Sequence, residues 1–283
     1  MGETVISWID RLVTGRSPSP ATERVVAELR AAPDQCAFRT AQQVADVVGV
    51  NVATVTRTAQ FLGFSGWPAF VLDYRGQYLA TLTADRMLSS SGRQDDAVRG
   101  AGSVLRDMRA LGALAEVLDE RSIDRGAELI RTARRGVVLA TGSFAGPATQ
   151  LSHGAQLLGC DLMLHVGAAS SQMTAVRSLG PGDVVVSFNI WKTAEVVNQL
   201  ALLAADRGAA LIVVGDRTTP VTQRADVSIT VPSESAGSLP STVPAVSVVQ
   251  ALLAGVADSD RATAEASLRE VEALWRSMGI VAD

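Results

Sequence analysis

The chain has 283 residues, of which 47% are hydrophobic and 19% charged, and its formal net charge at pH 7 is −4. This length allows two domains, and the hydrophobic content suffices for packed cores, which excludes a largely disordered chain. The negative net charge excludes a basic protein that coats nucleic acid, so any DNA contact must come from a local surface. Cys36 and Cys160 form no CxxC motif, which favours two buried thiols.

We expect a cytoplasmic protein without a membrane partner. No basic start followed by an apolar run of the secretory type is present at the N-terminus. The longest apolar stretch, residues 245–257, is interrupted and too short to cross a bilayer.

The N-terminal residues have the apolar spacing of helices. Apolar residues at helical spacing predict a helix over residues 1–14, and the glycine and prolines of "GRSPSP" (15–20) end it. A second helix is predicted over residues 21–32 and stops near Pro33.

The next stretch, residues 40–68, has the pattern of a helix-turn-helix. Thr40 followed by Gln43 is a capping box that predicts a helix start, and Gly49 supplies the left-handed turn that ends this short helix. Asn51 is a good N-cap for the following helix. Small Ala45 lets the two helices cross closely, and Val55 fills the wedge between them.

The second of these helices predicts a one-sided surface. One apolar stripe contains Val52, Val55, Ala59 and Leu62. The opposite face contains Ala53, Thr54, Arg57 and Gln60. Arg suits a guanine edge or a phosphate, Gln suits adenine, and Thr suits a phosphate or a thymine methyl group. An ordinary solvated helix face is the alternative, and the joint pattern favours DNA reading.

Residues 37–70, "AFRTAQQVADVVGVNVATVTRTAQFLGFSGWPAF", resemble the N-terminal domain of the RpiR family of bacterial transcription regulators. The resemblance implies DNA-facing roles for Thr54, Thr56 and Arg57. With the helix pattern, it gives five candidate DNA-binding residues: Asn51, Thr54, Thr56, Arg57 and Gln60. Thr58 and Phe61 depart mildly from the family pattern.

A change in composition then predicts a domain boundary. Residues 78–102 contain "SSSGRQDD", which has no apolar period and is typical of a linker. We therefore predict a helix-turn-helix domain over residues 1–77, a linker over 78–102 and a second domain over 103–283.

The second domain alternates short buried strands with helices. Strands are predicted in residues 136–140, 161–166, 183–188, 209–216 and 225–231. This alternation is typical of an α/β domain with a doubly wound parallel sheet.

Parallel sheets bind ligands beyond the carboxyl ends of their strands. The polar residues that follow the first and third strands are Thr141, Gly142, Ser143, Ser187, Asn189 and Thr193. Hydroxyls, backbone amides and a helix N-terminus together make a cradle for an anion or a sugar. The chain has no GxGxxG, GKT or GKS motif, so the nucleotide motifs are missing.

This half of the chain resembles the sugar-isomerase (SIS) domain found in RpiR-type regulators. The matching blocks are "LATGSFAGPATQLSHGAQLLG", "SLGPGDVVVSF" and "ALLAADRGAALIVVGDRTTPVTQRADVSITVP". The resemblance implies binding of a phosphorylated sugar, with Thr141, Gly142, Ser143 and Ser187 at ligand positions. Ala140 and Phe144 replace a family glycine and serine, and the turn "SFNIWKT" places Asn189, Ile190 and Trp191 where the family has small residues.

Packing is the alternative for this turn. Phe188, Ile190 and Trp191 could be core or interface residues, and we interpret Lys192 as a solvated charge.

Catalysis is the weaker hypothesis. His153 and His165 have no carboxylate neighbour in sequence, and Glu195 and Glu234 are ordinary in context although either could act as a base. No metal-ligand cluster, catalytic triad or cofactor motif is present, so we predict no catalytic residues and no cofactor.

The sequence thus predicts a regulator that binds a double-stranded DNA operator and senses a small-molecule effector, either a sugar phosphate or a related sugar derivative. Because operator half-sites are related by symmetry, a homodimer or homotetramer is expected. Two alternatives are a SIS-fold sugar-phosphate isomerase or lyase, and an oligomeric interaction module without an effector.

Overall fold

The computed structural model describes residues 4–83, 99–234 and 239–280. The chain folds into two compact units. The first unit contains residues 1–117 with the short segments Asp216–Thr218 and Pro232–Ser241, and the remaining residues form the second unit.

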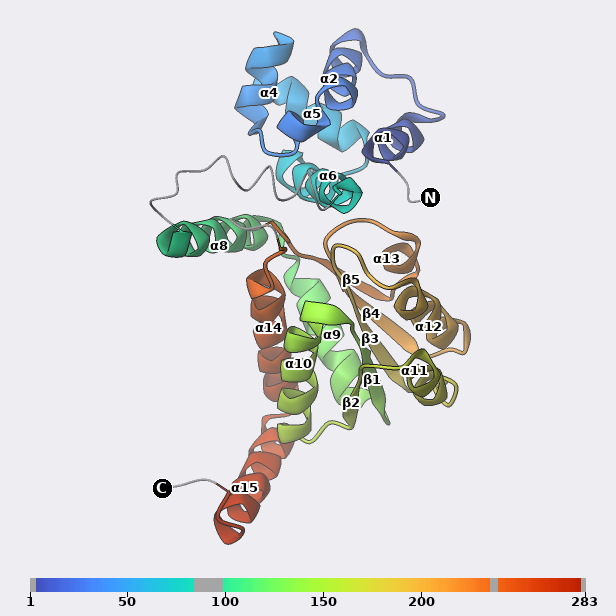
Figure 1. Cartoon of the computed structure of the whole chain (residues 1–283), viewed down its shortest axis with the longest axis vertical. Helices are drawn as coiled ribbons and strands as arrows, with labels where there is room; N and C mark the ends of the chain where they lie inside the picture. The colour runs from blue at the N-terminus through green and yellow to red at the C-terminus, as the bar shows by residue number, and fades with distance from the viewer. Residues whose placement is uncertain (1–3, 84–98, 235–238, 281–283) are drawn as a thin grey trace. The chain divides into compact units, whose positions relative to one another are not determined.

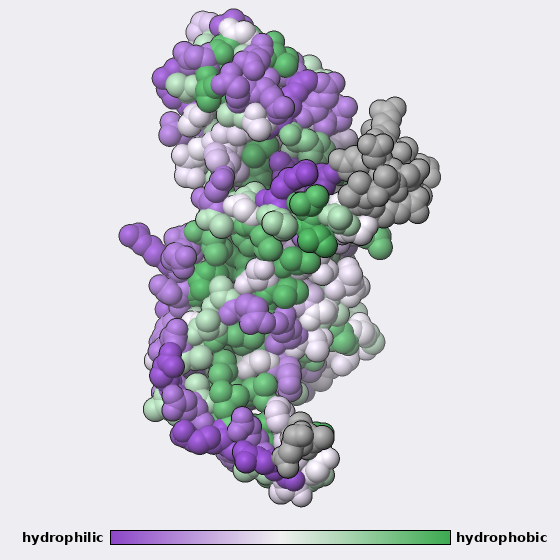
Figure 2. Space-filling view, turned by 90° about the vertical axis from the view of Figure 1, so that its left-hand side faces the viewer, coloured by the Kyte–Doolittle hydropathy of each residue, from purple (hydrophilic) through white to green (hydrophobic). Residues whose placement is uncertain are grey.

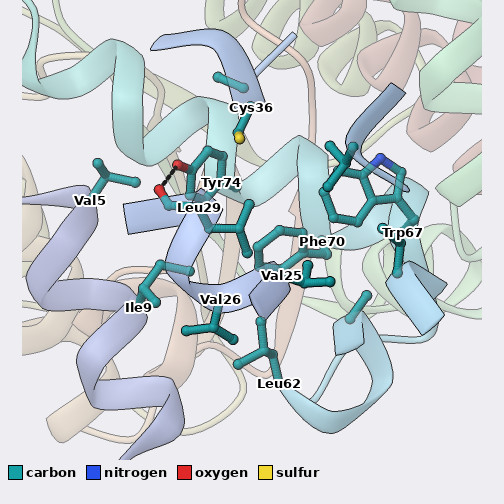
Figure 3. Close-up of a cluster of buried hydrophobic side chains, with 14 of the residues drawn as sticks. Val5, Ile9, Val25, Val26, Leu29, Cys36, Leu62, Trp67, Phe70 and Tyr74 are labelled. Atoms are coloured by element: carbon teal, nitrogen blue, oxygen red, sulfur yellow. Dashed lines mark hydrogen bonds between the residues drawn. The ribbon is translucent and has the colours of Figure 1, made fainter. Parts of the chain in front are cut away.

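The first unit is helical, and the helices within residues 5–81 surround an aromatic core. They are α1 (Val5–Val13), α2 (Pro20–Ala31), α3 (Pro33–Cys36), α4 (Ala41–Val48), α5 (Val52–Phe61), α6 (Trp67–Thr81) and α8 (Arg99–Val117). Trp8, Phe70 and Tyr74 are fully buried, with ring centroids 5.5–6.2 Å apart. Figure 3 shows the phenol of Tyr74 among aliphatic side chains, donating a 2.6 Å hydrogen bond to the Leu29 carbonyl oxygen. Cys36 is buried in the same core, and burial raises the pKa of its thiol to about 11.

The predicted linker differs from the structure at both ends. Helix α6 continues to Thr81, and the Phe38 and Tyr78 rings make an edge-to-face contact, so apolar packing extends the helix past the predicted boundary. Helix α8 begins at Arg99 and belongs to the first unit, although residues from 103 onward were predicted in the second domain. Residues 84–98 of the predicted linker lie outside the described residues.

Within the first unit, α6 also packs against the segment Asp216–Thr218. Asp73 is 4% exposed and accepts a 2.8 Å hydrogen bond from the Thr218 backbone N–H, while Gln77 donates to the Thr218 carbonyl oxygen at 2.8 Å. A Cβ atom at Gly76 would lie 2.0 Å from the Asp216 carbonyl oxygen, so this approach requires glycine. Burial raises the pKa of the Asp73 carboxyl group, against the effect of its hydrogen bonds.

The second unit has the predicted doubly wound parallel sheet. Its strands are β1 (Gly136–Leu139), β2 (Leu162–His165), β3 (Val184–Asn189), β4 (Ala210–Gly215) and β5 (Val227–Thr230), in the order β2-β1-β3-β4-β5. All four pairings are parallel, and Leu139 is in register with both His165 and Ser187. The carboxyl ends of β1, β2 and β3 therefore meet at one edge of the sheet.

Helices cover both faces of this sheet. One layer contains α9 (Glu120–Thr132), α10 (Ala145–Leu157) and α14 (Val243–Ser259), and the other contains α11 (Ala169–Val176), α12 (Glu195–Asp206) and α13 (Pro220–Arg224) (Figure 1). Helix α15 (Arg261–Ser277) extends beyond these layers. The α11–α12 side buries Leu139, Val185 and Val213 from alternate strand positions. Within the described ranges, no single helix is long and apolar enough to cross a membrane.

Replacing Tyr74 by Phe tests the core of the first unit. The variant keeps the ring but removes the hydrogen bond to Leu29, leaving a buried carbonyl oxygen short of a donor. We expect the free energy of unfolding, measured by urea denaturation, to fall by about 1–2 kcal/mol. Unchanged stability of Tyr74→Phe would show that this bond contributes nothing to the core.

Candidate DNA-reading helix and effector cradle

Helices α4 and α5 form the predicted helix-turn-helix. The Thr40 hydroxyl accepts a 3.2 Å hydrogen bond from the Gln43 N–H, and the Gln43 side chain accepts one of 2.9 Å from the Thr40 N–H, which confirms the capping box. Gly49 has φ 70°, the left-handed conformation predicted for the turn. Asn51 caps α5 by accepting a 2.8 Å hydrogen bond from the Thr54 N–H.

The apolar side of α5 is buried as predicted. Val55, Ala59 and Leu62 are at most 1% exposed, and they share the helical core with Ala45 of α4. Val52, at the start of the same stripe, is half-buried. The rotation of α5 about its axis is therefore fixed by packing.

Ala53, Arg57 and Gln60 lie exposed on the opposite side of α5, as does Asn51 at its N-cap. Thr56 is half-buried on the flank of this surface. We call these five residues the reading face. Arg57 is the sole charged residue in α5, so the electrostatic character of this face comes mainly from one guanidinium group.

The predicted position of Thr54 on the outer face of the helix needs correction. The residue is only 8% exposed. Its hydroxyl donates to Asn51 Oδ1 at 2.9 Å and accepts from Arg57 Nη2 at 3.2 Å. As the third residue of the helix, Thr54 folds back onto the N-cap side chain. It therefore positions Arg57 instead of presenting its own hydroxyl to a duplex.

At the carboxyl edge of the sheet, the loop after β1 offers polar groups to solvent. Gly142 has φ 60° in a 3₁₀ turn, Gly142–Phe144, that leads directly into α10. Gly142 and Ser143 are exposed and Thr141 is half-buried, whereas Phe144 is 5% exposed and packs inward.

The three helices that follow β1, β2 and β3 share one property. Among the described residues, no side chain caps the N-terminus of α10, α11 or α12, and the same holds for α14. By contrast, side chains cap α9, α13 and α15 of the same unit. Uncapped N–H groups carry partial positive charge and favour an anion.

The predicted ligand residues at the end of β3 are not open to solvent. Ser187 is fully buried and Asn189 is 3% exposed. The Ser187 hydroxyl donates to Asn189 Oδ1, Asn189 Nδ2 donates to Asn198 Oδ1, and Asn198 Nδ2 donates to Glu195 Oε2 at 3.3 Å. Because a carboxylate only accepts, Glu195 sets the direction of the whole chain of hydrogen bonds.

The accessible polar side chains near this turn are therefore further along the chain. Thr193 and Asn198 are half-buried, and Glu195 is exposed. Asn198 was not among the predicted residues, although its position one helical turn after Ala194 could have indicated it. Gln172 of α11 was not predicted either; it is fully buried and donates to the His165 carbonyl oxygen at 3.1 Å. No donor among the described residues reaches Gln172 Oε1.

The other residues of this turn are either packed in the interior or held in a strained backbone conformation. Phe188 and Ile190 are at most 3% exposed, in agreement with the packing alternative. Trp191 has φ 57°, which is costly for a bulky residue and is typical of functional turns. The Lys192 ammonium lies 5.4 Å from the centroid of the Trp191 ring, so this cation is stacked on an aromatic face.

The two carboxylates considered as bases already have partners. Glu195 accepts from Asn198, and Glu234 forms an ion pair with Arg75 inside the first unit. Across the described residues, no group of three His, Cys, Asp or Glu side chains could hold a metal ion.

Comparisons with known proteins connect both units to one type of regulator. No protein-family model matches the chain. The chain is 26% identical to the HTH-type transcriptional regulator HexR of Escherichia coli (strain K12) over 212 residues, which cover 74% of this chain and 72% of HexR. The sugar-isomerase domain of an RpiR transcription factor from Sphaerobacter thermophilus is 25% identical, with a TM-score of 0.59, and the match covers 62% of this chain and 98% of that domain. These matches support an RpiR-type regulator with a SIS domain.

A third comparison extends the shared fold to nearly the whole chain. The Vibrio vulnificus NanR protein, solved in complex with ManNAc-6P, matches with a TM-score of 0.62 at 15% identity. The match covers 99% of this chain and 100% of NanR.

Substitution of Gly49 tests the turn between α4 and α5. Alanine at φ 70° should lower the free energy of unfolding by about 1–2 kcal/mol, because its Cβ disfavours the left-handed conformation. Gly49→Asn is the matched control and should cost less, since asparagine tolerates this conformation. Equal losses for the two variants in urea denaturation would contradict the role of the backbone conformation.

Proposed function

We propose that this regulator binds a double-stranded DNA operator through the reading face of α5. One observation carries the proposal: the apolar stripe of α5 is buried, while Arg57 is exposed on the opposite side and held by Thr54. A helix packed on one side and polar on the other, in second position of a helix-turn-helix, is suited to the major groove.

Each side chain of the reading face has a separate proposed role. Arg57 can donate two hydrogen bonds to guanine or bind a phosphate, and Gln60 can pair with adenine. Asn51 and Thr56 lie at the edge of the face, where contacts to the phosphate backbone fix the register. The buried Thr54 acts through Arg57.

We propose that the second unit senses a small metabolite, either a sugar phosphate or a related sugar derivative. The uncapped N-termini of α10, α11 and α12 favour an anionic group. Thr141, Gly142, Ser143 and Thr193 would contact the effector directly, while Ser187 and Asn189 shape the cradle from beneath. NanR was solved with ManNAc-6P, a phosphorylated sugar derivative, which is the same chemical class.

We further propose that the chain regulates without catalysis, in the cytoplasm, as a homodimer or homotetramer. The ion pair of the largely buried Glu234 with Arg75 supports the absence of catalysis by that carboxylate, since a base for sugar isomerisation must reach a substrate proton. Self-association supplies the two reading faces that a symmetric operator needs. An effector that prefers one arrangement of the assembly would change operator affinity.

Arg57→Ala tests the DNA proposal. With an operator selected from genomic fragments by the wild-type chain, affinity should fall about tenfold to a hundredfold, as expected for one Arg–base contact. Arg269→Ala, which removes an exposed arginine of α15, is the control and should leave affinity unchanged. Equal operator binding by wild type and Arg57→Ala, in a gel-shift titration at fixed salt, would overturn the assignment.

Ser143→Asp tests the effector cradle. A carboxylate at this exposed position next to the start of α10 should repel an anionic ligand and occupy its N–H groups. In a thermal-shift titration with glucose 6-phosphate, 6-phosphogluconate and N-acetylglucosamine 6-phosphate, we expect the wild type to be stabilised by at least one of them. Ser143→Asp should lose that shift, and Ser143→Ala should largely keep it. A shift that survives Ser143→Asp would place the anion elsewhere.

A further inference from the structure

The second unit contains a cavity of about 390 Å³ at the amino edge of its sheet. Helix α9 from one helical layer lines it, together with the ends of α12 and α13 from the other layer (Figure 1). The residues at the starts of β3, β4 and β5 complete the lining. This volume is typical of pockets that hold small molecules. Because the proposed effector cradle is at the carboxyl edge, the two places lie at opposite ends of the strands.

Charged side chains of both signs line the cavity. They are Arg125, Asp183, Arg224 and Asp226. Figure 2 shows a band of apolar and weakly polar surface over the second unit, so this concentration of charge is a local feature and not a general property of the unit. A cavity of this kind disfavours an apolar ligand and favours one that itself carries charges.

Asp183, directly before β3, is buried, and the protein balances its charge. Its side chain is 1% exposed and forms ion pairs with Arg134 at 3.2 Å and Arg135 at 3.5 Å. Its Oδ2 atom accepts a 2.9 Å hydrogen bond from the Gly180 N–H, whereas Oδ1 accepts no hydrogen bond from any described residue. Asp183 therefore leaves one acceptor unused beside the cavity but adds no uncompensated charge to it.

The other three charges are less fully compensated. Arg125, Arg224 and Asp226 are exposed. Within the described ranges, the Arg125 side chain forms no hydrogen bond or ion pair, and Arg224 has one loose ion pair, at 3.8 Å from Asp206 Oδ1. Asp226 Oδ2 accepts a 2.8 Å hydrogen bond from the Leu211 N–H, and its Oδ1 atom remains available. The cavity thus offers two guanidinium groups and one carboxylate to a ligand.

Helix α9 adds apolar and hydroxyl groups to this charged site. Arg125, Leu129 and Thr132 follow one another at i, i+4 and i+7, so they lie on one side of the helix. Leu129 and Ala205 of α12 provide apolar contacts for the carbon chain of a small ligand. The Thr132 hydroxyl can donate or accept a hydrogen bond.

We infer that this cavity binds an acidic amino acid, which carries two carboxylates and one ammonium group. The two carboxylates pair with Arg125 and Arg224, because the guanidinium fork matches the geometry of a carboxylate. The ammonium group donates to Asp226 Oδ1, with the carboxylate of Asp183 close by. The charges of such a ligand are complementary to those that the cavity leaves uncompensated.

The same charges disfavour related small molecules. A dicarboxylic acid has no cation for Asp226, and a diamine has no anion for the two arginines. This inference goes beyond the proposed function, because it adds a second ligand of a different chemical class at a separate place in the second unit.

Titration of the full chain with L-glutamate and L-aspartate tests the inference. At least one of them should stabilise the wild type in a thermal-shift assay, while succinate, which is L-aspartate without its amino group, should stabilise it far less. Arg125→Ala should raise the dissociation constant, measured by isothermal titration calorimetry, about tenfold or more. Arg121→Ala, which removes an exposed arginine one turn earlier on α9 and outside the cavity, is the matched control and should bind as wild type does.

Each contrary result overturns the inference. These results are the absence of stabilisation by both amino acids, equal binding of succinate and L-aspartate, and wild-type affinity in Arg125→Ala. If circular dichroism shows that Arg125→Ala is unfolded, Arg224→Gln decides in its place. Ser143→Asp, at the opposite edge of the sheet, should keep the binding of the amino acid; its loss there would place the ligand in the effector cradle and overturn the inference as well.

Discussion

Burial of one side of α5 is the constraint on which the account of this regulator depends. Once Val55 and Ala59 pack into the helical core, the rotation of the helix is fixed and every other side chain on it has a determined direction. The Asn51 cap then fixes where the helix starts, and Thr54 connects that cap to the Arg57 guanidinium. A single cation in an otherwise neutral helix thereby reaches solvent in a defined place. The negative net charge of the chain is compatible with DNA binding for this reason, since the contact depends on local geometry rather than on bulk charge.

In the second unit, side-chain hydrogen bonds likewise fix the orientation of polar groups at the carboxyl edge of the sheet. The exposed carboxylate of Glu195 orients Asn198, then Asn189, and finally the Ser187 hydroxyl inside the protein. The inward end of this chain of hydrogen bonds is already satisfied, so the accessible part of the proposed cradle is the loop after β1 together with the N-termini of the following helices.

Much of this architecture could be predicted because local signals agreed with the tertiary packing. The Thr40 capping box, the left-handed Gly49 and the Asn51 cap each depend on a few neighbouring residues, and all three are present. The five parallel strands followed from apolar runs between helices. The failures have a common cause. Thr54 and Ser187 were assigned by their position on a helix face or at a strand end, but their hydroxyls are held by Asn51 and Asn189. Side-chain hydrogen bonds of this kind, and the packing that extends α6 beyond residue 77, cannot be derived from periodicity.

The central claim is that the outer side of α5 enters a DNA groove. It can be tested by measuring the alkylation rate of a cysteine placed at Ala53. This position is exposed on the reading face, and the reaction can be followed in a Cys160→Ser background because Cys36 is buried with a raised thiol pKa. Bound operator should strongly slow alkylation at position 53 while leaving a cysteine placed at Ala266 on α15 as reactive as in free protein. Equal alkylation rates at position 53 with and without bound operator would contradict it.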